Sequence, residues 1–256
     1  MMAKRYYITT PIYYVNAVPH IGTALTTMVC DMVARYQRLR GMDAIFLTGT
    51  DENGPKVLEA AQKSGRETME FVTEISDNFR KTFAAMHFDY FDFIRTTEPR
   101  HHRAVCHFFE ILKQKGHVYE GVYEGWYDVS SETFYREADL VDGKSPDGNP
   151  VQWVSEKNWF FRLSAFGDPL LKHIEQNPEF LLPESRRNEV VSFIKQGLRD
   201  MAISRANNGW GIPVPGSPEQ VFYVWFDALI SYIAATGWPD GDWQSAWPAD
   251  VHWMAK

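Results

Sequence analysis

Residues 5–54 constrain the fold more than any other part of the sequence, because their pattern predicts a strand, a long helix and a second strand. Residues 6–10 and 45–48 are rich in β-branched and aromatic side chains, which favour strands. Between them, residues 25–39 place apolar side chains at helical spacing, and Gly41 is typical of a helix C-terminal cap. Two parallel strands joined by a right-handed crossover helix are the expected result.

Two polar loops follow the two expected strands. Residues 19–23 read PHIGT before the helix, and residues 48–54 read TGTDENG after the second strand. In open α/β sheets ligands bind beyond the carboxyl ends of the strands, where both loops would lie. The helix that begins near Gly22 would also point its unpaired backbone N–H groups there. The segment therefore predicts an anion site at this edge of the sheet.

The bulk properties limit the classes of protein to which the chain can belong. Its 256 residues permit one or two domains, and its formal net charge of −7 argues against a general nucleic-acid footprint. With only Cys30 and Cys106, neither a disulfide framework nor a cysteine zinc site is available. No apolar stretch is long enough for a signal peptide or a membrane span, so we expect a soluble, cytoplasmic protein without a membrane partner.

The rest of the chain predicts more helices and a small β-rich insertion. Residues 68–86 and 103–115 have apolar stripes that should cover the sheet, and residues 170–177 and 185–198 are also typical of helices. From residue 116 glycines, aromatic residues and alternation favour strands, and residues 201–204 and 222–225 are strand-like too. Residues 227–233 return to helical spacing. We expect three regions, namely residues 1–115, 116–221 and 222–256.

Ordered motifs along the chain point to a family. The first two are residues 10–16 (TPIYYVN), which lead into His20, and residues 46–54 (FLTGTDENG). Further motifs are residues 91–97 (FDFIRTT), 123–127 (YEGWY), 158–163 (NWFFRL), 183–190 (PESRRNEV), 203–205 (ISR), 210–215 (WGIPVP) and 223–229 (YVWFDAL). With these motifs the chain resembles the class I aminoacyl-tRNA synthetases from about residue 6 to residue 256, and most closely the bacterial-type methionyl-tRNA synthetases.

The resemblance implies an α/β fold: the Rossmann-like parallel sheet of a class I synthetase, split by a small α+β connective insertion at residues 116–221. It also implies a reaction, in which L-methionine and ATP, bound with Mg²⁺, form methionyl-adenylate before transfer to tRNA(Met). The implied catalytic residues are His20, Gly22 and Thr23, and the implied ATP-binding residues are these three with Asn53. The implied methionine-binding residues are Pro11, Ile12, Tyr14, Asp51 and Trp225, with Arg205 a weaker candidate.

The resemblance also implies roles for these side chains. Asp51 would pair with the α-ammonium group of the amino acid, while Ile12, Tyr14 and Trp225 would surround its thioether. The alternatives from the residues themselves are a turn histidine at position 20, a loop-capping aspartate at position 51 and a core tryptophan at position 225.

The chain departs from the family pattern at two motif positions. Thr23 stands where the family most often has a second histidine, so it either donates one hydrogen bond to phosphate or only caps the helix. Asn53 replaces a histidine of the second loop, and its amide can hydrogen-bond to ribose or backbone but cannot titrate.

Many relatives bind zinc in the insertion through cysteine pairs. At the matching places this chain has Asp128, Ser131, Ser145 and Asp147, which do not make a sulfur-rich tetrahedral site. We therefore expect no structural zinc, and a knuckle held instead by aromatic residues. These are Trp126, Tyr127, Phe134 and Tyr135.

In the family, a lysine-rich loop (KMSKS) and a helical anticodon-binding domain follow the region matched here. We therefore expect this chain to correspond to the amino-terminal part of such an enzyme and to form no appreciable adenylate alone. Two alternatives remain from the sequence: a class I synthetase for another apolar amino acid, and a catalytically silent paralogue that binds without reacting.

Overall fold

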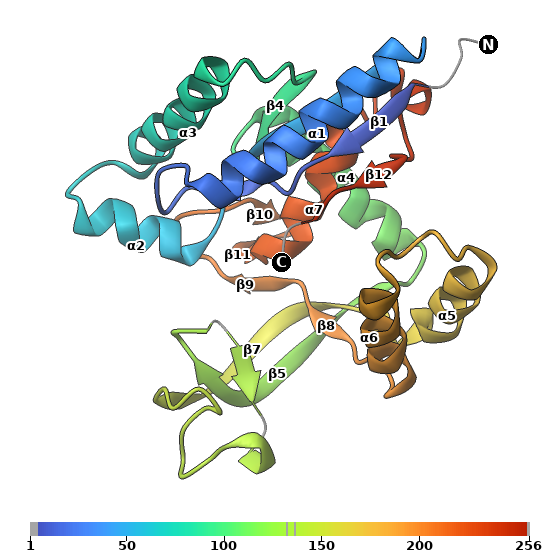
Figure 1. The fold of residues 1–256 in the computed structure, drawn as a ribbon. Helices are drawn as coiled ribbons and strands as arrows, with labels where there is room; N and C mark the ends of the chain where they lie inside the picture. Colours follow the sequence, from blue (N-terminus) through green and yellow to red (C-terminus); the bar gives the residue numbers. More distant parts are fainter. Residues whose placement is uncertain (1–4, 132, 136, 255–256) are drawn as a thin grey trace. The chain divides into compact units, whose positions relative to one another are not determined.

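A parallel sheet organises the first of two units into which the chain divides, Met1–Glu110 with Asn207–Lys256; the second unit is Ile111–Ala206. Figure 1 shows the computed structural model, which describes residues 5–131, 133–135 and 137–254. Among these residues, no helix combines the length and the apolar character needed to cross a bilayer.

The sheet is the predicted α/β arrangement, and all its pairings are parallel. Strand β3 pairs with β1 and β2 on one side and with β4 on the other, and β12 pairs with β1. The bounds are β1 Tyr6–Thr9, β2 Tyr13–Tyr14, β3 Ala44–Asp51, β4 Asp92–Arg95 and β12 Val251–His252. Every residue of β3 is buried, as expected for a central strand. The carboxyl ends of β1, β3, β4 and β12 therefore meet at one edge.

Helices pack around this sheet, and their bounds are α1 Ile21–Leu39, α2 Pro55–Lys63, α3 Thr68–Ala85, α4 Pro99–Gln114 and α7 Val224–Ala234. The stripe on α3 is confirmed, because Phe79 and Phe83 pack with Phe93 of β4. Helix α4 starts four residues before the expected position, at a proline, whose missing N–H costs nothing in the first turn. Helix α2 begins in the same way, at Pro55.

The expected strand at residues 222–225 is wrong. Strand β11, Ser217–Phe222, pairs with β10, Pro213–Val214, and it ends before Tyr223. Tyr223 has extended dihedral angles and is the N-cap of α7, so Trp225 lies in the first turn of a helix. Aromatic residues favour a strand here, but burial at helical spacing decides for a helix. The buried side of α7 includes Val224, Asp227, Ala228 and Ser231.

The apolar stripe that predicts α1 faces outwards. Leu25 and Met32 are 60% and 61% exposed, and Met28, Tyr36 and Leu39 are exposed as well. The inward face carries small residues instead: Cys30 and Ala34 pack against Ile8 of β1 and Phe46 of β3. The strands supply the large side chains of this interface, so the helix contributes small ones.

Gly49 marks a close approach of two strands. It pairs with Ile94 of β4, and a Cβ atom at position 49 would lie 2.1 Å from the Ile94 carbonyl oxygen. Because backbone atoms cannot yield as a flexible side chain can, only glycine fits there.

The second unit contains the predicted β-rich segment. Among its described residues, an antiparallel sheet has the order β6-β5-β7-β8. The strands are β5 Val118–Asp128, β6 Thr133–Tyr135, β7 Val151–Phe161 and β8 Met201–Ala202, and β9 is Ser204–Ala206. The two expected helices are α5 Gly167–Gln176 and α6 Glu184–Lys195. Short 3₁₀ turns occupy Glu137–Asp139, Leu163–Phe166 and, in the first unit, Trp243–Ser245.

Candidate functional site

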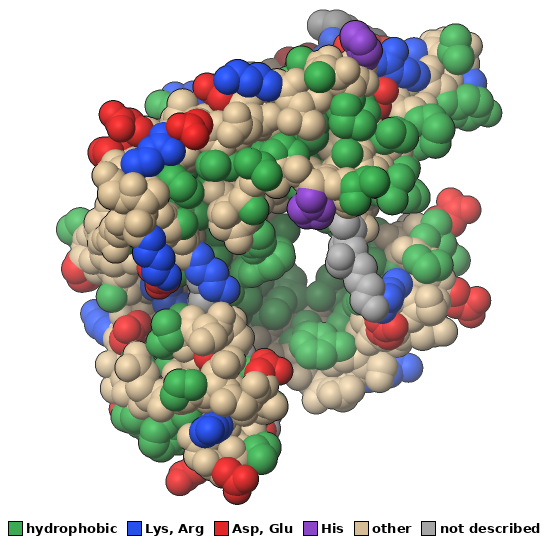
Figure 2. Space-filling model, turned by 60° about the vertical axis from the view of Figure 1, so that its left-hand side comes forward, with side chains coloured by type: hydrophobic (Ala, Val, Ile, Leu, Met, Phe, Trp, Pro, Cys, Tyr) green, Lys and Arg blue, Asp and Glu red, His purple; other side chains and the backbone are tan. Residues whose placement is uncertain are grey.

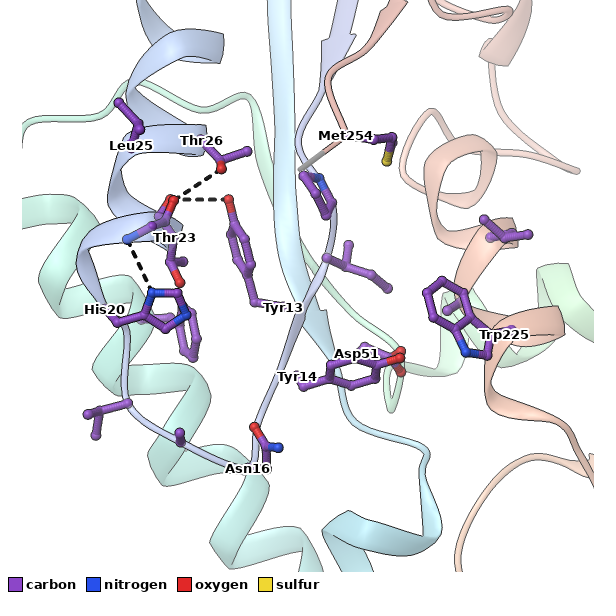
Figure 3. Close-up of a pocket in the computed structure, with 18 of the residues that line it drawn as sticks. Tyr13, Tyr14, Asn16, His20, Thr23, Leu25, Thr26, Asp51, Trp225 and Met254 are labelled. Atoms are coloured by element: carbon purple, nitrogen blue, oxygen red, sulfur yellow. Dashed lines mark hydrogen bonds between the residues drawn. The ribbon is translucent and has the colours of Figure 1, made fainter. Parts of the chain in front are cut away.

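A cavity of about 830 Å³ opens at the carboxyl edge of the parallel sheet. It is bounded by the start of α1, by β2 with the loop before it, by the end of β3 and by α7 (Figure 3). Eight residues named from the sequence line it, namely Pro11, Ile12, Tyr14, His20, Gly22, Thr23, Asp51 and Trp225. The two polar loops therefore reach one cavity, although Asp51 lies 28 positions after Thr23 in the sequence.

His20 caps α1 at the mouth of the cavity. Its Nδ1 accepts a hydrogen bond from the Gly22 backbone N–H at 3.1 Å, so the neutral ring carries its proton on Nε2 and keeps one donor free for a ligand. In the alternative, a turn histidine would donate to a backbone carbonyl oxygen. Here the ring accepts from a backbone N–H instead. A Cβ atom at position 22 would lie 3.0 Å from His20 Cε1, so Gly22 leaves room for the imidazole.

Thr23 is not the cap of α1, because His20 occupies that position. Thr23 lies three residues further, in the first turn, and is 5% exposed. Its carbonyl oxygen accepts hydrogen bonds from the hydroxyl groups of Thr27 (3.0 Å) and Tyr13 (3.3 Å). Figure 3 shows Thr23 beside His20 on the cavity wall. The first turn of α1 is therefore a polar end of the cavity with backbone N–H groups directed outwards.

Asp51 ends β3 and is 4% exposed in the wall of the cavity. The next residue, Glu52, is fully buried and fixes this loop: its Oε1 accepts hydrogen bonds from Arg95 (2.8 Å) and Ser76 (2.5 Å). The Trp210 indole N–H donates to the Glu52 carbonyl oxygen at 2.7 Å. A carboxylate held at the strand end by such a network is preorganised for a cation.

Tyr14 of β2, which pairs with Asp51, and Trp225 of α7 form an aromatic pair. Their rings meet edge to face with centroids 6.4 Å apart, and both side chains are about half exposed, at 45% and 52%. Trp225 is therefore not a core residue. Figure 3 places the two rings near Asp51. Exposed aromatic faces beside a carboxylate favour a ligand with one apolar end and one cationic end.

Sequence reasoning missed the helical face that continues from Trp225. Ala228, Leu229 and Tyr232 line the cavity and follow Trp225 at helical spacing; we call these four residues the cavity face of α7. The helical spacing of these residues is visible in the sequence, but the aromatic pattern of residues 222–225 predicts a strand at Trp225. Burial raises the pKa of Tyr232 to about 12, so its phenol is neutral at physiological pH.

Tyr13 is a second missed residue. Its ring stacks on Phe79 with centroids 5.6 Å apart, and its hydroxyl group bonds to Thr27 at 2.9 Å. Burial raises the pKa of Tyr13 to about 12. Tyr13 and Tyr14 are neighbours on β2 and both line the cavity, but the motif predicts a site role for Tyr14 alone.

Two predicted site residues do not line this cavity. Asn53 is 5% exposed, and its amide nitrogen donates to the Thr96 carbonyl oxygen at 3.0 Å. Arg205 belongs to the second unit, where its guanidinium donates to the Ser204 carbonyl oxygen at 2.7 Å.

The place of the family's zinc knuckle carries a hydrogen-bonded carboxylate. Asp128 is fully buried; its Oδ1 accepts the Ser130 N–H at 2.8 Å, and its Oδ2 accepts the Asn149 amide at 3.0 Å. Burial raises the pKa of Asp128, but hydrogen bonds from Asn149, Ser145 and Ser131 outweigh it and hold the pKa below its ordinary value. Among the described residues no three His, Cys, Asp or Glu side chains converge on one point. Two aspartates and two serines, at positions 128, 147, 131 and 145, do not form the sulfur-rich tetrahedral ligand set of a structural zinc ion.

Three of the four aromatic residues expected to hold the knuckle have described side chains. Trp126 meets Trp153 edge to face with centroids 5.5 Å apart, and Tyr127 and Tyr135 lie in the paired strands β5 and β6. The side chain of Phe134 lies outside the described part of the structure.

The family model for tRNA synthetases class I (M) matches residues 6–152 and 138–256. The chain belongs to this family. A methionine–tRNA ligase of Rickettsia conorii is 50% identical over 258 residues, which cover 100% of this chain and 51% of the relative. One of Thermotoga maritima is 47% identical over 98% of this chain and 41% of the relative.

Solved synthetase structures have the same fold. The Mycobacterium tuberculosis methionyl-tRNA synthetase bound by methionyl-adenylate has a TM-score of 0.91 and 44% identity, over 97% of this chain and 51% of that protein. Its apo form has a TM-score of 0.80 and 41% identity, over 98% of this chain and 49% of that protein. The chain thus spans about half the length of the synthetases that it matches. The Rossmann-like fold and the family expected from the motifs are confirmed.

Proposed function

We propose that this chain is the amino-terminal catalytic part of a methionine–tRNA ligase, which activates L-methionine with ATP. The observation that carries the proposal is one cavity with three matched features. The Asp51 carboxylate suits the α-ammonium group, the Tyr14–Trp225 pair suits a thioether, and the start of α1 suits phosphate. The methionine–tRNA ligases among its relatives support the same reading.

The proposed reaction is an in-line displacement at the α-phosphorus of ATP. The carboxylate oxygen of methionine forms a bond to this phosphorus, and the bond to the bridging oxygen of pyrophosphate breaks. Methionyl-adenylate and pyrophosphate result, and no proton has to move to complete the step. Catalysis then consists of positioning two anions and of stabilising the charge of the transition state.

Each end of the cavity contributes to that positioning. Asp51, fixed by the Glu52 network, orients the amino group so that the methionine carboxylate points towards α1. His20 donates from Nε2 to a phosphate oxygen, while Gly22 permits close approach of the nucleotide. The pair of neutral phenols, Tyr13 and Tyr232, keeps the cavity wall uncharged near the reacting carboxylate.

Further partners follow from the same proposal. Mg²⁺ would accompany ATP and balance its phosphate charge, and tRNA(Met) would accept the methionyl group in the complete enzyme. On the face shown in Figure 2, basic and acidic side chains alternate in small groups, and among the described residues no single basic patch spans that face. Contacts with tRNA are therefore local. We also propose that residues 116–221 are the connective insertion and that the protein acts in the cytoplasm.

Calorimetry with the 256-residue chain tests the amino-acid assignment. We expect weak binding of methionine, weaker binding of isoleucine and leucine, and loss of the preference in Trp225→Ala. Equal binding of all three amino acids would instead favour a synthetase for another apolar amino acid.

Pyrophosphate exchange tests activity. We expect no appreciable exchange of labelled pyrophosphate into ATP by the chain alone, and exchange when the carboxyl half of a relative is supplied. Exchange that stays absent, with methionine binding intact, would favour a silent paralogue.

A further inference from the structure

Trp210, the first residue of the WGIPVP motif, is held in place by its own loop. The flanking residues, Gly209 and Gly211, have φ angles of 91° and 121°, which favour glycine. Asn207 ties the loop to β11: its amide donates to the Pro218 carbonyl oxygen at 2.8 Å, and its Oδ1 accepts the Gly209 N–H at 2.8 Å. The indole of Trp210 is therefore presented by an anchored turn.

The Trp210 side chain makes two kinds of contact with the earlier part of the chain. Its indole N–H donates to the Glu52 carbonyl oxygen at 2.7 Å. Its rings pack against a cluster of valines that are at most 2% exposed and come from the residue after β2, from α2 and from α3, namely Val15, Val57 and Val72. An indole that donates at one edge and packs with its rings has a fixed orientation.

These contacts fall immediately beyond the last pair of β2 with β3. Tyr14 and Asp51 are the partners in this pair, and both line the cavity. Val15 follows Tyr14, and Glu52 follows Asp51. Because β2 has only two residues, its ladder with β3 is shorter than that of most strands, and contacts outside the ladder have to hold this end. Trp210 joins the two segments at that place.

We propose that Trp210 is a positioning residue for the amino-acid site, which keeps Asp51 and Tyr14 at the spacing that a ligand with an α-ammonium group requires. The hydrogen bond fixes the backbone next to the Asp51 carboxylate, and the packing fixes the segment that carries the Tyr14 ring. Trp210 does not line the cavity itself, so it acts through the residues that it holds. This inference rests on the proposed function and deepens it.

A double-mutant cycle on methionine binding to the 256-residue chain tests the proposal. Trp210→Phe keeps an aromatic ring against the valines but removes the indole N–H, so it should raise the methionine Kd roughly three- to tenfold, the effect of one lost hydrogen bond. In the Asp51→Asn background the same change should alter the Kd by less than about twofold, because Trp210 acts on methionine through the Asp51 carboxylate. A merely structural role would weaken binding by the same factor in both backgrounds.

Trp238→Phe is the matched control. Trp238 is partly buried like Trp210 and belongs to the same unit, but it contacts His107 and Phe108 of α4 and does not line the cavity. Trp238→Phe should leave the methionine Kd unchanged. Urea denaturation of every variant, followed by circular dichroism, shows that differences in affinity are not differences in the folded fraction.

Four outcomes would overturn the inference. If Asp51→Asn and Trp225→Ala weaken methionine binding but Trp210→Phe does not, this inference alone fails. Equal effects of Trp210→Phe in the two backgrounds would mean that Trp210 does not act through Asp51. Equal weakening by Trp238→Phe would show a general effect of losing an indole. If Asp51→Asn and Trp225→Ala are silent, the proposed function fails, and this inference fails with it.

Discussion

The buried neighbours His101 of α4 and Asp227 of α7 make a quantitative prediction about stability and pH; His101 Nε2 lies 3.4 Å from Asp227 Oδ1. In the folded state His101 is neutral down to a pKa of about 3, whereas the unfolded value is 6.5; burial is the cause. Between these values the unfolded chain binds the additional proton, so His101 lowers stability as the pH falls. Asp227 has the opposite sign, because its folded pKa is raised well above 3.8 and the folded chain binds the additional proton.

From pH 6 to pH 5 these two contributions oppose each other in the unmodified chain. The variant Asp227→Asn leaves His101 buried and removes the group that takes up the compensating proton. Its free energy of unfolding should therefore fall more steeply from pH 6 to pH 5 than that of the unmodified chain. His101→Gln should change in the opposite direction, with a rise of up to about 1.4 kcal/mol per pH unit.

Urea denaturation at pH 6 and pH 5, followed by tryptophan fluorescence, measures these differences, and other titrating groups cancel in the comparison between variants. Parallel pH profiles of Asp227→Asn and the unmodified chain would refute the reasoning. They would show that Asp227 holds no additional proton in the folded chain over this pH range.

Three further predictions concern the site and the knuckle. Asp51→Asn should weaken methionine binding by about 1.5–3 kcal/mol, the range of a hydrogen bond to a charged group, and an unchanged Kd would remove Asp51 from the site. In a protein that has both halves, Thr23→His should lower the ATP Michaelis constant in pyrophosphate exchange, because an imidazole reaches further than a hydroxyl; a rise would mean that Thr23 and Asn53 are adapted to each other. The purified chain should contain zinc well below one equivalent and keep its circular dichroism spectrum in chelator, while unfolding on chelation would contradict the role given to Asp128.

Local pattern was sufficient to predict the elements that position the site. The β-branched strand at residues 6–10, the loop before α1 and the TGTDENG loop indicated a parallel sheet with both loops at one edge. These signals are local. Parallel topology then brings the two loops together, since the carboxyl ends of parallel strands share an edge.

The orientation of two helices was not predictable in the same way. Periodicity shows that α1 is amphipathic, but the side that meets the sheet depends on how much space the strands leave. Ile8 and Phe46 fill that space, so Cys30 and Ala34 face inwards. In α7 the helical spacing of residues 227–233 is predicted, but the aromatic residues before it favour a strand at Trp225, so Ala228, Leu229 and Tyr232 are not assigned to the cavity.

Gly49 limits which amino-acid substitutions the sheet of this protein can tolerate. In a library of random substitutions selected for folding, position 49 should return glycine alone, because any Cβ would meet the Ile94 carbonyl oxygen at 2.1 Å. Gly41 has a φ of 84° but open space around its Cα, so asparagine should survive there. Asp51 lies two residues beyond Gly49 on the same strand, and any separation of β3 from β4 would carry its carboxylate away from the cavity. Drift can therefore alter residues such as Thr23 of α1 and Asn53 of the loop after β3 while a residue with no side chain stays fixed.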